Sequence, residues 1–476
     1  MPSRLLPPIA AAALLACLTT AGCRPAMAPA AGPPGAARPK PLPTDGMPTP
    51  AGDTAGAWRS RPDSADRRET VPLGDPSLLA GIPGEGPLVL STLTTWLADP
   101  ANHVPLEYQL PAWLEPGAGQ VKDLSANPPT RAKIELGRQL FFDPRLSADG
   151  SMSCATCHEP AHGFTVATAV VRGVSGAPGR RNPPTLLNRI MLAVGDDRQM
   201  WDGRAASVED ALLHTLRDPD EMGAYPETTL AMLREIECYR IQFEKSYGGV
   251  SWSALGDAIG QFVRCLVTGD APYDQLVRWR SYETLPADLL ADDPALAARH
   301  AEARAAAEAH PVSAAALRGE SLFFGNRAWC SACHNGVNFT DECFHNTGVG
   351  LDQPDPDLGR YEVTGRDEDW GAFKTPTIRG AVHTAPYMHD GSVATLLDVI
   401  EWYAHEGREN RNLDERFRRI PGGVLTTEDK HDLVAFIEAC SGPLPAVETG
   451  RLPLDPQDAD EAGRPANGRQ AATRRP

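Results

Sequence analysis

Two short motifs with the spacing C-x-x-C-H constrain this chain of 476 residues more than any other feature. The motif residues are Cys154, Cys157 and His158 in the first copy, and Cys330, Cys333 and His334 in the second. In an exported protein, two thiols at this spacing add to the vinyl groups of one porphyrin, and the adjacent histidine becomes an iron ligand. A zinc site would need further cysteines or histidines at finger-like spacing nearby, and a thioredoxin-like motif would need a βαβ context. The sequence therefore predicts two covalently bound c-type haems.

The surroundings of the two motifs resemble each other. Leu-Phe-Phe precedes the motifs at 140–142 and at 322–324, and Phe-Thr follows them at 164–165 and at 339–340. Apolar residues with a helical period lie before each motif, and clusters of Gly and Pro separate further helical segments. We therefore expect a mainly α protein with two cytochrome c-like haem domains related by duplication.

The composition changes along the chain predict where these domains lie. We expect an N-terminal haem domain with a helical extension at 76–310 and a C-terminal haem domain at 311–442. Residues 24–75 begin with a stretch that is rich in Pro and Ala and poor in large apolar side chains, which is typical of an extended tether. The polar segment 443–476 is predicted to be a disordered tail.

Residues 1–23 have the pattern of an export signal. An early Arg4 precedes an apolar run that is too short to span a bilayer and that ends in small residues. The Ala-Gly-Cys sequence ending at Cys23 is similar to a bacterial lipoprotein box, so we expect a lipid on Cys23, with cleavage at a small residue such as Ala28 as the alternative. Both alternatives predict a location in the bacterial periplasm, and the first adds a membrane anchor.

The charge of the chain indicates what kind of partner it binds. The sequence has 45 Lys and Arg against 62 Asp and Glu, which gives a formal net charge of -17. Nucleic-acid binding needs a basic face, so the composition argues against DNA or RNA as a partner. An acidic protein instead attracts a basic protein partner.

Over residues 130–440 the chain resembles the bacterial di-haem cytochrome c peroxidases and the MauG-like enzymes. Besides the haem motifs, the resemblance rests on 140–147 (LFFDPRLS), 181–188 (RNPPTLLN), 201–204 (WDGR), 221–223 (EMG), 357–360 (DLGR), 373–379 (FKTPTIR) and 385–391 (APYMHDG). The order of these matches follows the family. By resemblance, the first haem reacts with hydrogen peroxide, and the second receives electrons from a small donor such as a cytochrome c or a cupredoxin.

The resemblance also implies two catalytic residues. Glu221 matches the distal glutamate of the family, which carries a proton from one peroxide oxygen to the other. Trp201 matches the tryptophan that bridges the two haems, where an aromatic ring assists electron transfer. The alternatives from the residues alone are a surface glutamate at a helix end and an aromatic residue of the core.

We predict that no side chain of the protein provides the sixth ligand of the first iron. In many family peroxidases a distal His blocks this position, but residues 171–180, which match that stretch, contain no His or Met. We expect the first haem to be five-coordinate or bound to water. Met191, Met200 and His162 are weaker candidates for this ligand. His214 departs from the usual family residue and is expected either at the distal pocket or in the core.

The sixth ligand of the second iron distinguishes two branches of the family. A Met that lies fourteen residues after the His of the Tyr-x-His-Asp-Gly motif binds iron in the peroxidases, whereas a Tyr does so in MauG. Tyr403 lies fourteen residues after His389, and Met388 is the weaker alternative. A phenolate ligand stabilises ferric iron more than a thioether does, so Tyr403 predicts a lowered potential and MauG-like oxidation chemistry.

The family also binds one calcium ion between its haem domains, through an Asn side chain and two backbone carbonyls. Asn182, Thr384 and Pro386 match these positions. Ligands that are all oxygen atoms suit a hard cation, so we expect one calcium ion here.

Three functions are compatible with these features. The leading one is a di-haem peroxidase that reduces hydrogen peroxide, the first alternative is MauG-like oxidation of a partner protein, and the second is a non-enzymatic di-haem electron carrier. The carrier would require six-coordinate iron at both haems, which the predicted open position and Glu221 argue against. The cysteines outside the haem motifs, which are expected as disulfides or buried thiols, are Cys238, Cys265, Cys343 and Cys440.

Overall fold

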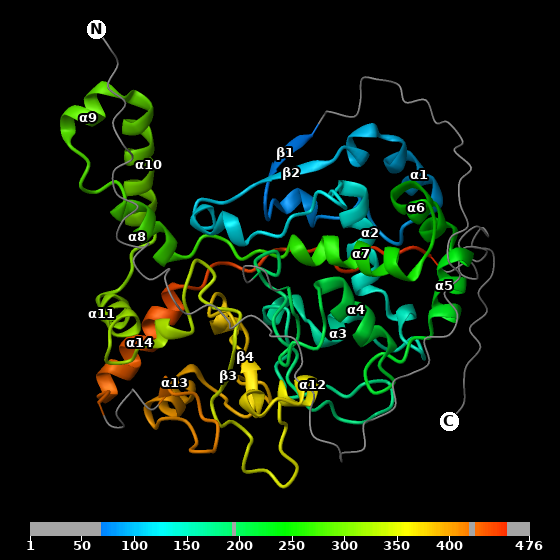
Figure 1. Ribbon diagram of the computed structural model, residues 1–476. Coiled ribbons are helices and arrows are strands. Elements are labelled where there is room, and N and C mark those ends of the chain that lie inside the picture. The colour runs from blue at the N-terminus through cyan, green and yellow to red at the C-terminus, as the bar shows by residue number, and fades with distance from the viewer. Residues whose placement is uncertain (1–67, 193–196, 418–423, 455–476) are drawn as a thin grey trace, which may run out of the picture. The chain divides into compact units, whose positions relative to one another are not determined.

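The computed structural model describes residues 68–192, 197–417 and 424–454, and these belong to one compact unit (Figure 1). The predicted export signal with Cys23, most of the predicted tether and residues 455–476 lie outside the described residues. Helices predominate and strands are few and short, so the expectation of a mainly α protein is confirmed.

Seven α-helices lie in the described part of the chain around the first motif. They are α1 (Leu90–Ala98), α2 (Arg131–Phe142), α3 (Cys154–Cys157), α4 (Val208–Arg217), α5 (Pro226–Glu235), α6 (Glu237–Tyr247) and α7 (Trp252–Arg264). Polar caps start several of them: the side chain of Thr130 accepts a hydrogen bond from the backbone of α2, and that of Ser207 does so at α4. A two-stranded parallel sheet of β1 (Glu69–Pro72) and β2 (Leu106–Gln109) lies before α2 in the chain.

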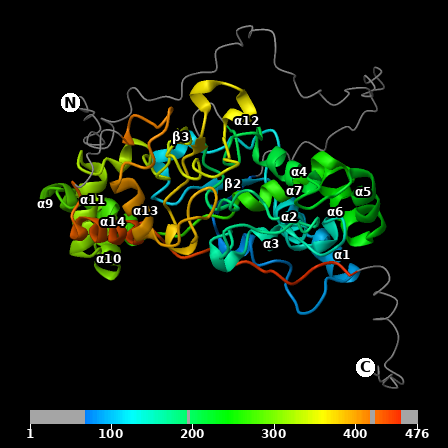
Figure 2. The ribbon, with the colours of Figure 1, turned by 90° about the horizontal axis from the view of Figure 1, so that it is seen from below.

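The second motif lies in a similar helical setting. The helices are α8 (Pro272–Arg280), α9 (Ala287–Asp292), α10 (Pro294–Ala309), α11 (Ala314–Phe324), α12 (Tyr361–Thr364), α13 (Leu396–Ala404) and α14 (Thr427–Ala439). The antiparallel strands β3 (Phe344–Asn346) and β4 (Ala372–Lys374) follow the motif. Figures 1 and 2 show α11, α13 and α14 side by side at one end of the unit, and α2, α4, α6 and α7 at the other.

The same pair of crossed helices occurs once in each half. α2 packs on α7 and α11 packs on α14, and each contact is centred on a glycine of the first helix. A methyl group on Gly137 would overlap the carbonyl oxygen of Ala258, and one on Gly319 would overlap that of Asp432. The glycines therefore let the backbones approach closely, and aromatic side chains fill the space beside them. These rings are Phe141 and Phe262, with centroids 5.2 Å apart, and Phe323 and Phe436, with centroids 5.0 Å apart.

The end of the described chain differs from the sequence prediction. Residues 443–454 were expected in the disordered tail, but they cross back to the amino-terminal half. The guanidinium group of Arg138 donates hydrogen bonds to the carbonyl oxygens of Glu448 (2.8 Å) and Arg451 (2.9 Å). Leu444, Val447 and Leu452 pack against the apolar core of that half. The predicted tail begins too early because scattered apolar residues and backbone carbonyls are enough to hold an extended segment.

The amino-terminal end of the folded part also differs from the sequence prediction. Residues 69–72 fall within the predicted tether 24–75, yet they form β1. Within the described ranges, every helix is too short or too polar to cross a bilayer.

The glycine contacts give a test of the fold. We expect Gly137→Ala and Gly319→Ala each to lower the free energy of unfolding by about 1–3 kcal/mol, because the added methyl forces packed helices apart. Denaturant unfolding would measure this. Gly119→Ala is the control, since an added methyl there meets no atom within 4 Å. Equal stability of Gly137→Ala and Gly119→Ala would contradict the close packing of α2 on α7.

Candidate functional site

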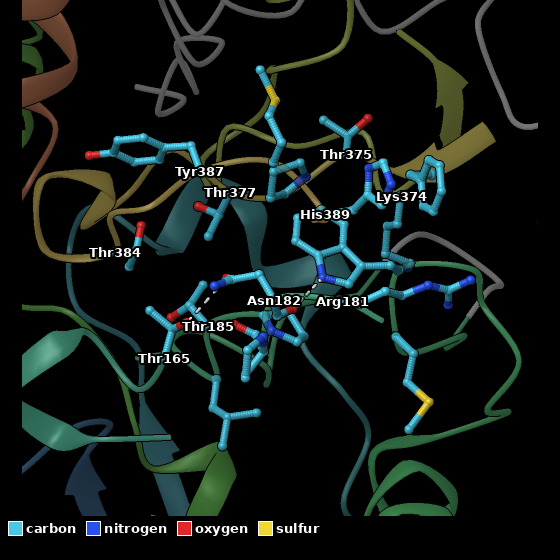
Figure 3. A pocket seen from close by; sticks show the side chains of 18 of the residues that line it. Thr165, Arg181, Asn182, Thr185, Lys374, Thr375, Thr377, Thr384, Tyr387 and His389 are labelled. Carbon is cyan, nitrogen blue, oxygen red and sulfur yellow. Dashed lines mark hydrogen bonds between the residues drawn. The ribbon is translucent and has the colours of Figure 1, made fainter. Parts of the chain in front are cut away.

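One cavity of about 460 Å³ is lined by residues of both C-x-x-C-H motifs. The motif residues that reach it are Cys154, Cys157, His158, Cys330, Cys333 and His334. Figure 3 shows part of its wall, where Arg181, Asn182 and His389 lie close together. The tertiary structure therefore brings the two predicted cofactor sites into one continuous space.

The two motif histidines have the orientation that an iron ligand needs. Nδ1 of His158 donates a hydrogen bond to the carbonyl oxygen of Phe164 (2.9 Å), and Nδ1 of His334 donates to that of Phe339 (3.2 Å). These bonds leave Nε2 of each ring without a proton and available to a metal. Burial lowers the pKa of His158 to about 4 and also lowers that of His334, so both rings are neutral at pH 7.

The motif thiols fit the same cofactor. Burial raises the pKa of Cys154 to about 12 and that of Cys157 to about 11, and Cys330 is raised to about 12 by the same cause. None of these thiols is in a disulfide in this structure. With the neutral histidines and the apolar cavity, they fit two covalently attached haems rather than a reactive thiol centre.

Glu221 lies at the amino-terminal side of the cavity, on the segment that follows α4. It lines the cavity together with Thr215, Leu216 and Met222. Burial raises the pKa of Glu221, and Asp218 raises it further. Arg204 also lines the cavity, with Nη2 3.9 Å from Oε1 of Glu221. A carboxyl group that is more basic than usual, beside a cation, can accept and return a proton.

Trp201 is held where the two halves meet. Its indole Nε1 donates a hydrogen bond to the carbonyl oxygen of Asn182 (2.8 Å), and its own carbonyl oxygen accepts one from the backbone of Lys374 in β4 (2.7 Å). Close by, the ring of His389 stacks on Phe373 with a centroid distance of 3.6 Å. Aromatic rings from both halves therefore line the cavity along with the haem motifs.

Two candidates for the second iron ligand lie in the cavity. Tyr403, on α13, and Met388 both line it. Tyr403 stacks on Phe417, with ring centroids 5.3 Å apart, and burial holds the pKa of its hydroxyl well above the usual range.

Of the three weaker candidates for the sixth ligand of the first iron, Met200 lines the cavity and the other two do not. Met191 is buried in a separate apolar cluster, and His162 is half-exposed and pairs with Glu159. His214 is exposed on α4, so it does not lie in the core. It does not line the cavity, but it is close enough to Glu221 to lower the pKa of that carboxyl. The loop 171–180 reaches the cavity through Val171, Gly173 and Gly179, which carry no metal-binding side chain.

The three predicted calcium-binding positions share one wall of the cavity. Asn182, Thr384 and Pro386 all line it. Asn182 is buried, and its Nδ2 donates hydrogen bonds to the carbonyl oxygens of Thr168 and Ala169 (3.1 Å each). This anchoring fixes the side-chain amide, and the backbone of Asn182 also donates to the carbonyl oxygen of His389 (2.7 Å).

A charged cluster near the second motif was missed by the sequence analysis. Nδ1 of the buried His345 lies 2.7 Å from Asp414, and its Nε2 lies 2.9 Å from Asp341. Burial alone would lower the pKa of His345, but Asp341, Asp414 and the sulfur of Cys333 outweigh it and raise this pKa to about 11. The ring also lines the cavity. Asp341 is only four residues from His345, but Asp414 is 69 residues away, so the fold is what brings the second carboxylate to the ring.

The structure shows the state of three of the cysteines outside the motifs. Cys238, Cys265 and Cys440 are buried free thiols, so the second of the two expectations applies to them. Burial raises the pKa of Cys238 to about 11 and of Cys265 to about 12. Such thiols are unreactive and act as small apolar side chains.

Comparisons with known proteins agree with this site. The family profile described as "Di-haem cytochrome c peroxidase" matches residues 131–281. The methylamine utilization protein MauG of Methylorubrum extorquens is 33% identical over 331 residues, covering 69% of this chain and 83% of that protein. Cytochrome c551 peroxidase of Pseudomonas aeruginosa is 31% identical over 393 residues, covering 80% of this chain and 97% of that protein.

Two solved structures superpose on this chain. A crystal structure of a MauG-like protein associated with microbial copper homeostasis superposes with a TM-score of 0.58 and 28% identity, covering 71% of this chain and 95% of that chain. The diheme peroxidase BthA from Burkholderia thailandensis has the same fold, with a TM-score of 0.51 and 21% identity over 68% of this chain and 89% of that chain.

The His345 cluster predicts a stability that depends on pH. We expect His345→Gln to lower the free energy of unfolding by about 1–3 kcal/mol at pH 7, because two half-buried carboxylates lose the imidazolium between them while Arg416 still pairs with Asp414 (2.9 Å). In the wild type the raised pKa stabilises the fold fully below about pH 6.5, and this contribution is lost as the pH rises through 11. The difference between variant and wild type should therefore narrow from pH 7 to pH 10. Urea unfolding would measure it, with the exposed His405→Gln as control; a constant difference would contradict the assignment.

Proposed function

The chain belongs to the family of di-haem cytochrome c peroxidases and MauG proteins, and we propose that it reduces hydrogen peroxide to water with electrons from a small redox protein. The observation that carries this proposal is the single cavity that contains both haem motifs and Glu221. The two haems, when bound, supply the two electrons that peroxide reduction consumes, one from each iron. The carboxy-terminal haem is the one proposed to receive electrons from the donor.

The protein's part at the first haem is to bind, orient and move protons. Cys154 and Cys157 would attach the porphyrin, and Nε2 of His158 would hold its iron. Glu221 would accept a proton from one oxygen of the peroxide and return it to the other oxygen. Its raised pKa suits this role because the carboxyl exchanges protons more readily near neutral pH.

Trp201 is proposed to carry electrons between the haems. Its two hydrogen bonds tie it to Asn182 on one side and to Lys374 on the other, which supports a fixed position between the halves. Asn182, with the backbone carbonyls of Thr384 and Pro386, is proposed to bind one calcium ion beside it. Oxygen ligands of this kind suit a hard cation. Because Asn182 belongs to the amino-terminal half and the two carbonyls belong to the carboxy-terminal half, the bound ion would link the two halves.

The location of Tyr403 favours a second candidate function, which is peroxide-dependent oxidation of a partner protein in the manner of MauG. Tyr403 lines the cavity near the second motif and carries the hydroxyl oxygen that a MauG-type ligand requires. A phenolate at this iron would stabilise its oxidised state. Relatives named MauG and relatives named peroxidase are similarly close in sequence, so the second iron ligand is the feature that distinguishes the two functions.

The partners and the location follow from charge and export. The net charge of -17 supports a basic donor protein, such as a cytochrome c or a cupredoxin. The proposed location is the bacterial periplasm. A lipid on Cys23, which lies outside the described residues, would anchor the protein to a membrane there.

Replacing Glu221 tests the peroxidase function. We expect Glu221→Gln to lower peroxide turnover by at least ~100-fold, because the amide cannot carry a proton. Steady-state assays with a reduced cytochrome c would measure it, and Glu227→Gln on the exposed start of α5 is the matched control. Electron paramagnetic resonance of the resting ferric protein should show a high-spin first haem. Unchanged turnover in Glu221→Gln would contradict the role of Glu221. Two low-spin haems and no peroxide turnover in the wild type would instead favour a non-enzymatic electron carrier.

Replacing Tyr403 tests the second haem. We expect Tyr403→Met to raise the reduction potential of this haem, because a thioether stabilises ferrous iron relative to a phenolate. Spectroelectrochemical titration would measure the potential, with Tyr361→Phe on α12 as the control. An unchanged potential would remove Tyr403 as the ligand and leave Met388 as the candidate.

A further inference from the structure

Arg204 lies between two carboxylates at the amino-terminal side of the cavity. Its Nη1 is 3.0 Å from Oδ2 of Asp202, and its Nη2 is 3.9 Å from Oε1 of Glu221. Its backbone NH also donates to Oδ1 of Asp202 (3.1 Å). Arg204 and Glu221 both line the cavity, whereas Asp202 is buried behind them. The guanidinium group therefore faces the same space as the proposed proton carrier.

Asp202 is itself fixed from the carboxy-terminal half. Nη1 of Arg181 lies 2.5 Å from its Oδ2, and Arg181 contacts Asp357 through Nε (2.6 Å) and Nη2 (2.8 Å). Arg360 donates a hydrogen bond to the carbonyl oxygen of Asp202 (3.1 Å). Charges of alternating sign thus run from Asp357 across the interface to Glu221.

The turn that carries Arg204 has little freedom to move. Gly203 has a φ of +68°, and a side chain there would collide with Phe344 and Arg360 of the other half. The aspartate and the glycine of this turn are therefore held by contacts outside it, and Asp202 in turn holds the guanidinium group of Arg204. A guanidinium held in this way loses little conformational entropy when it pairs with a carboxylate.

We propose that Arg204 is a positioning residue for Glu221: held by Asp202, it fixes the carboxyl at the cavity and favours its ionised form. This inference rests on the proposed role of Glu221 as the proton carrier. The function of Arg204 is then to offset the burial of Glu221, so that the carboxyl can still take up a proton from an incoming ligand.

The groups around Glu221 decide the direction of the expected effect. Burial raises the pKa of Glu221 most; Asp218, at the end of α4, raises it further. Thr215, Arg204 and His214 lower it, and Cys157 faces it from the haem motif. Arg204 keeps its positive charge at every pH of interest. Without this charge, less would offset the increase in the pKa of Glu221 that burial and Asp218 cause. The pKa of Glu221 should therefore rise when Arg204 is lost.

Cyanide binding to the ferric holoprotein provides a readout that does not depend on turnover. Cyanide enters as HCN and transfers its proton to a base at the distal side, so its binding rate reports the fraction of Glu221 that is ionised. The rate would be measured optically from pH 4 to pH 8 for the wild type, Glu221→Gln, Arg204→Gln and Arg204→Lys. Arg240→Gln, an exposed arginine on α6 that also pairs with glutamates, is the matched control.

We expect Arg204→Gln to move the ionisation in this pH profile upward by about half a unit to one unit, as for loss of a partly exposed ion pair. Arg204→Lys should give a smaller shift of the same sign, because the ammonium keeps the positive charge but lacks the planar fork that holds the guanidinium in place. If Arg204→Gln does not mature with haem, this Lys variant still tests the proposal. Arg240→Gln should leave the profile unchanged.

The outcomes separate this inference from the proposed function. If Glu221→Gln retains the ionisation, Glu221 is not the distal base, and its proposed role fails. If Glu221→Gln abolishes the ionisation while both Arg204 variants leave it unshifted, Glu221 keeps its role and the positioning role of Arg204 is overturned. A downward shift in the Arg204 variants would overturn it as well.

Discussion

Buried ion pairs across the interface of the two halves are the interaction on which the cavity depends. Glu342 accepts hydrogen bonds from Arg189 (3.0 Å) of the amino-terminal half and Lys374 (2.7 Å) of its own half, and these cations outweigh burial and lower its pKa. Arg181 links Asp202 to Asp357 in the same way. Removing charges from water is costly unless each is fully paired, so these groups favour one arrangement of the halves over others. Arg181, Arg189 and Lys374 also line the cavity, so these pairs join its two sides.

Each half contributes a rigid platform to this interface. The helix pairs α2 with α7 and α11 with α14 meet at glycines and are filled in by aromatic rings, which leaves little room for adjustment. The motif histidines are then oriented by backbone carbonyls rather than by mobile side chains. Such second contacts determine which ring nitrogen is free for a metal, and so they matter as much as the ligands themselves.

Much of the site was predictable because its residues lie in short local motifs. The spacing of Cys154, Cys157 and His158 predicts covalent haem without any knowledge of the fold, and several residues of the quoted family segments, among them Trp201 and Glu221, line the cavity. The prediction failed where the contacts are distant in sequence or weakly patterned. The pairing of His345 with two carboxylates was not predicted. His214 is exposed on its helix. Residues 443–454 are packed against the core although their composition suggested a tail.

The sequence by itself determined the chemistry of attachment and the mainly helical fold, because both depend on residue type and local spacing, and its resemblance to the family implied Tyr403 as a candidate ligand. Only the tertiary structure decided that both motifs share one cavity, that Arg204 lies beside Glu221, and that Asp202 is tied to the opposite half. These facts depend on how two helical platforms dock. Docking is governed by side-chain packing and by paired buried charges between segments that are far apart in the chain, and no local pattern encodes such distances.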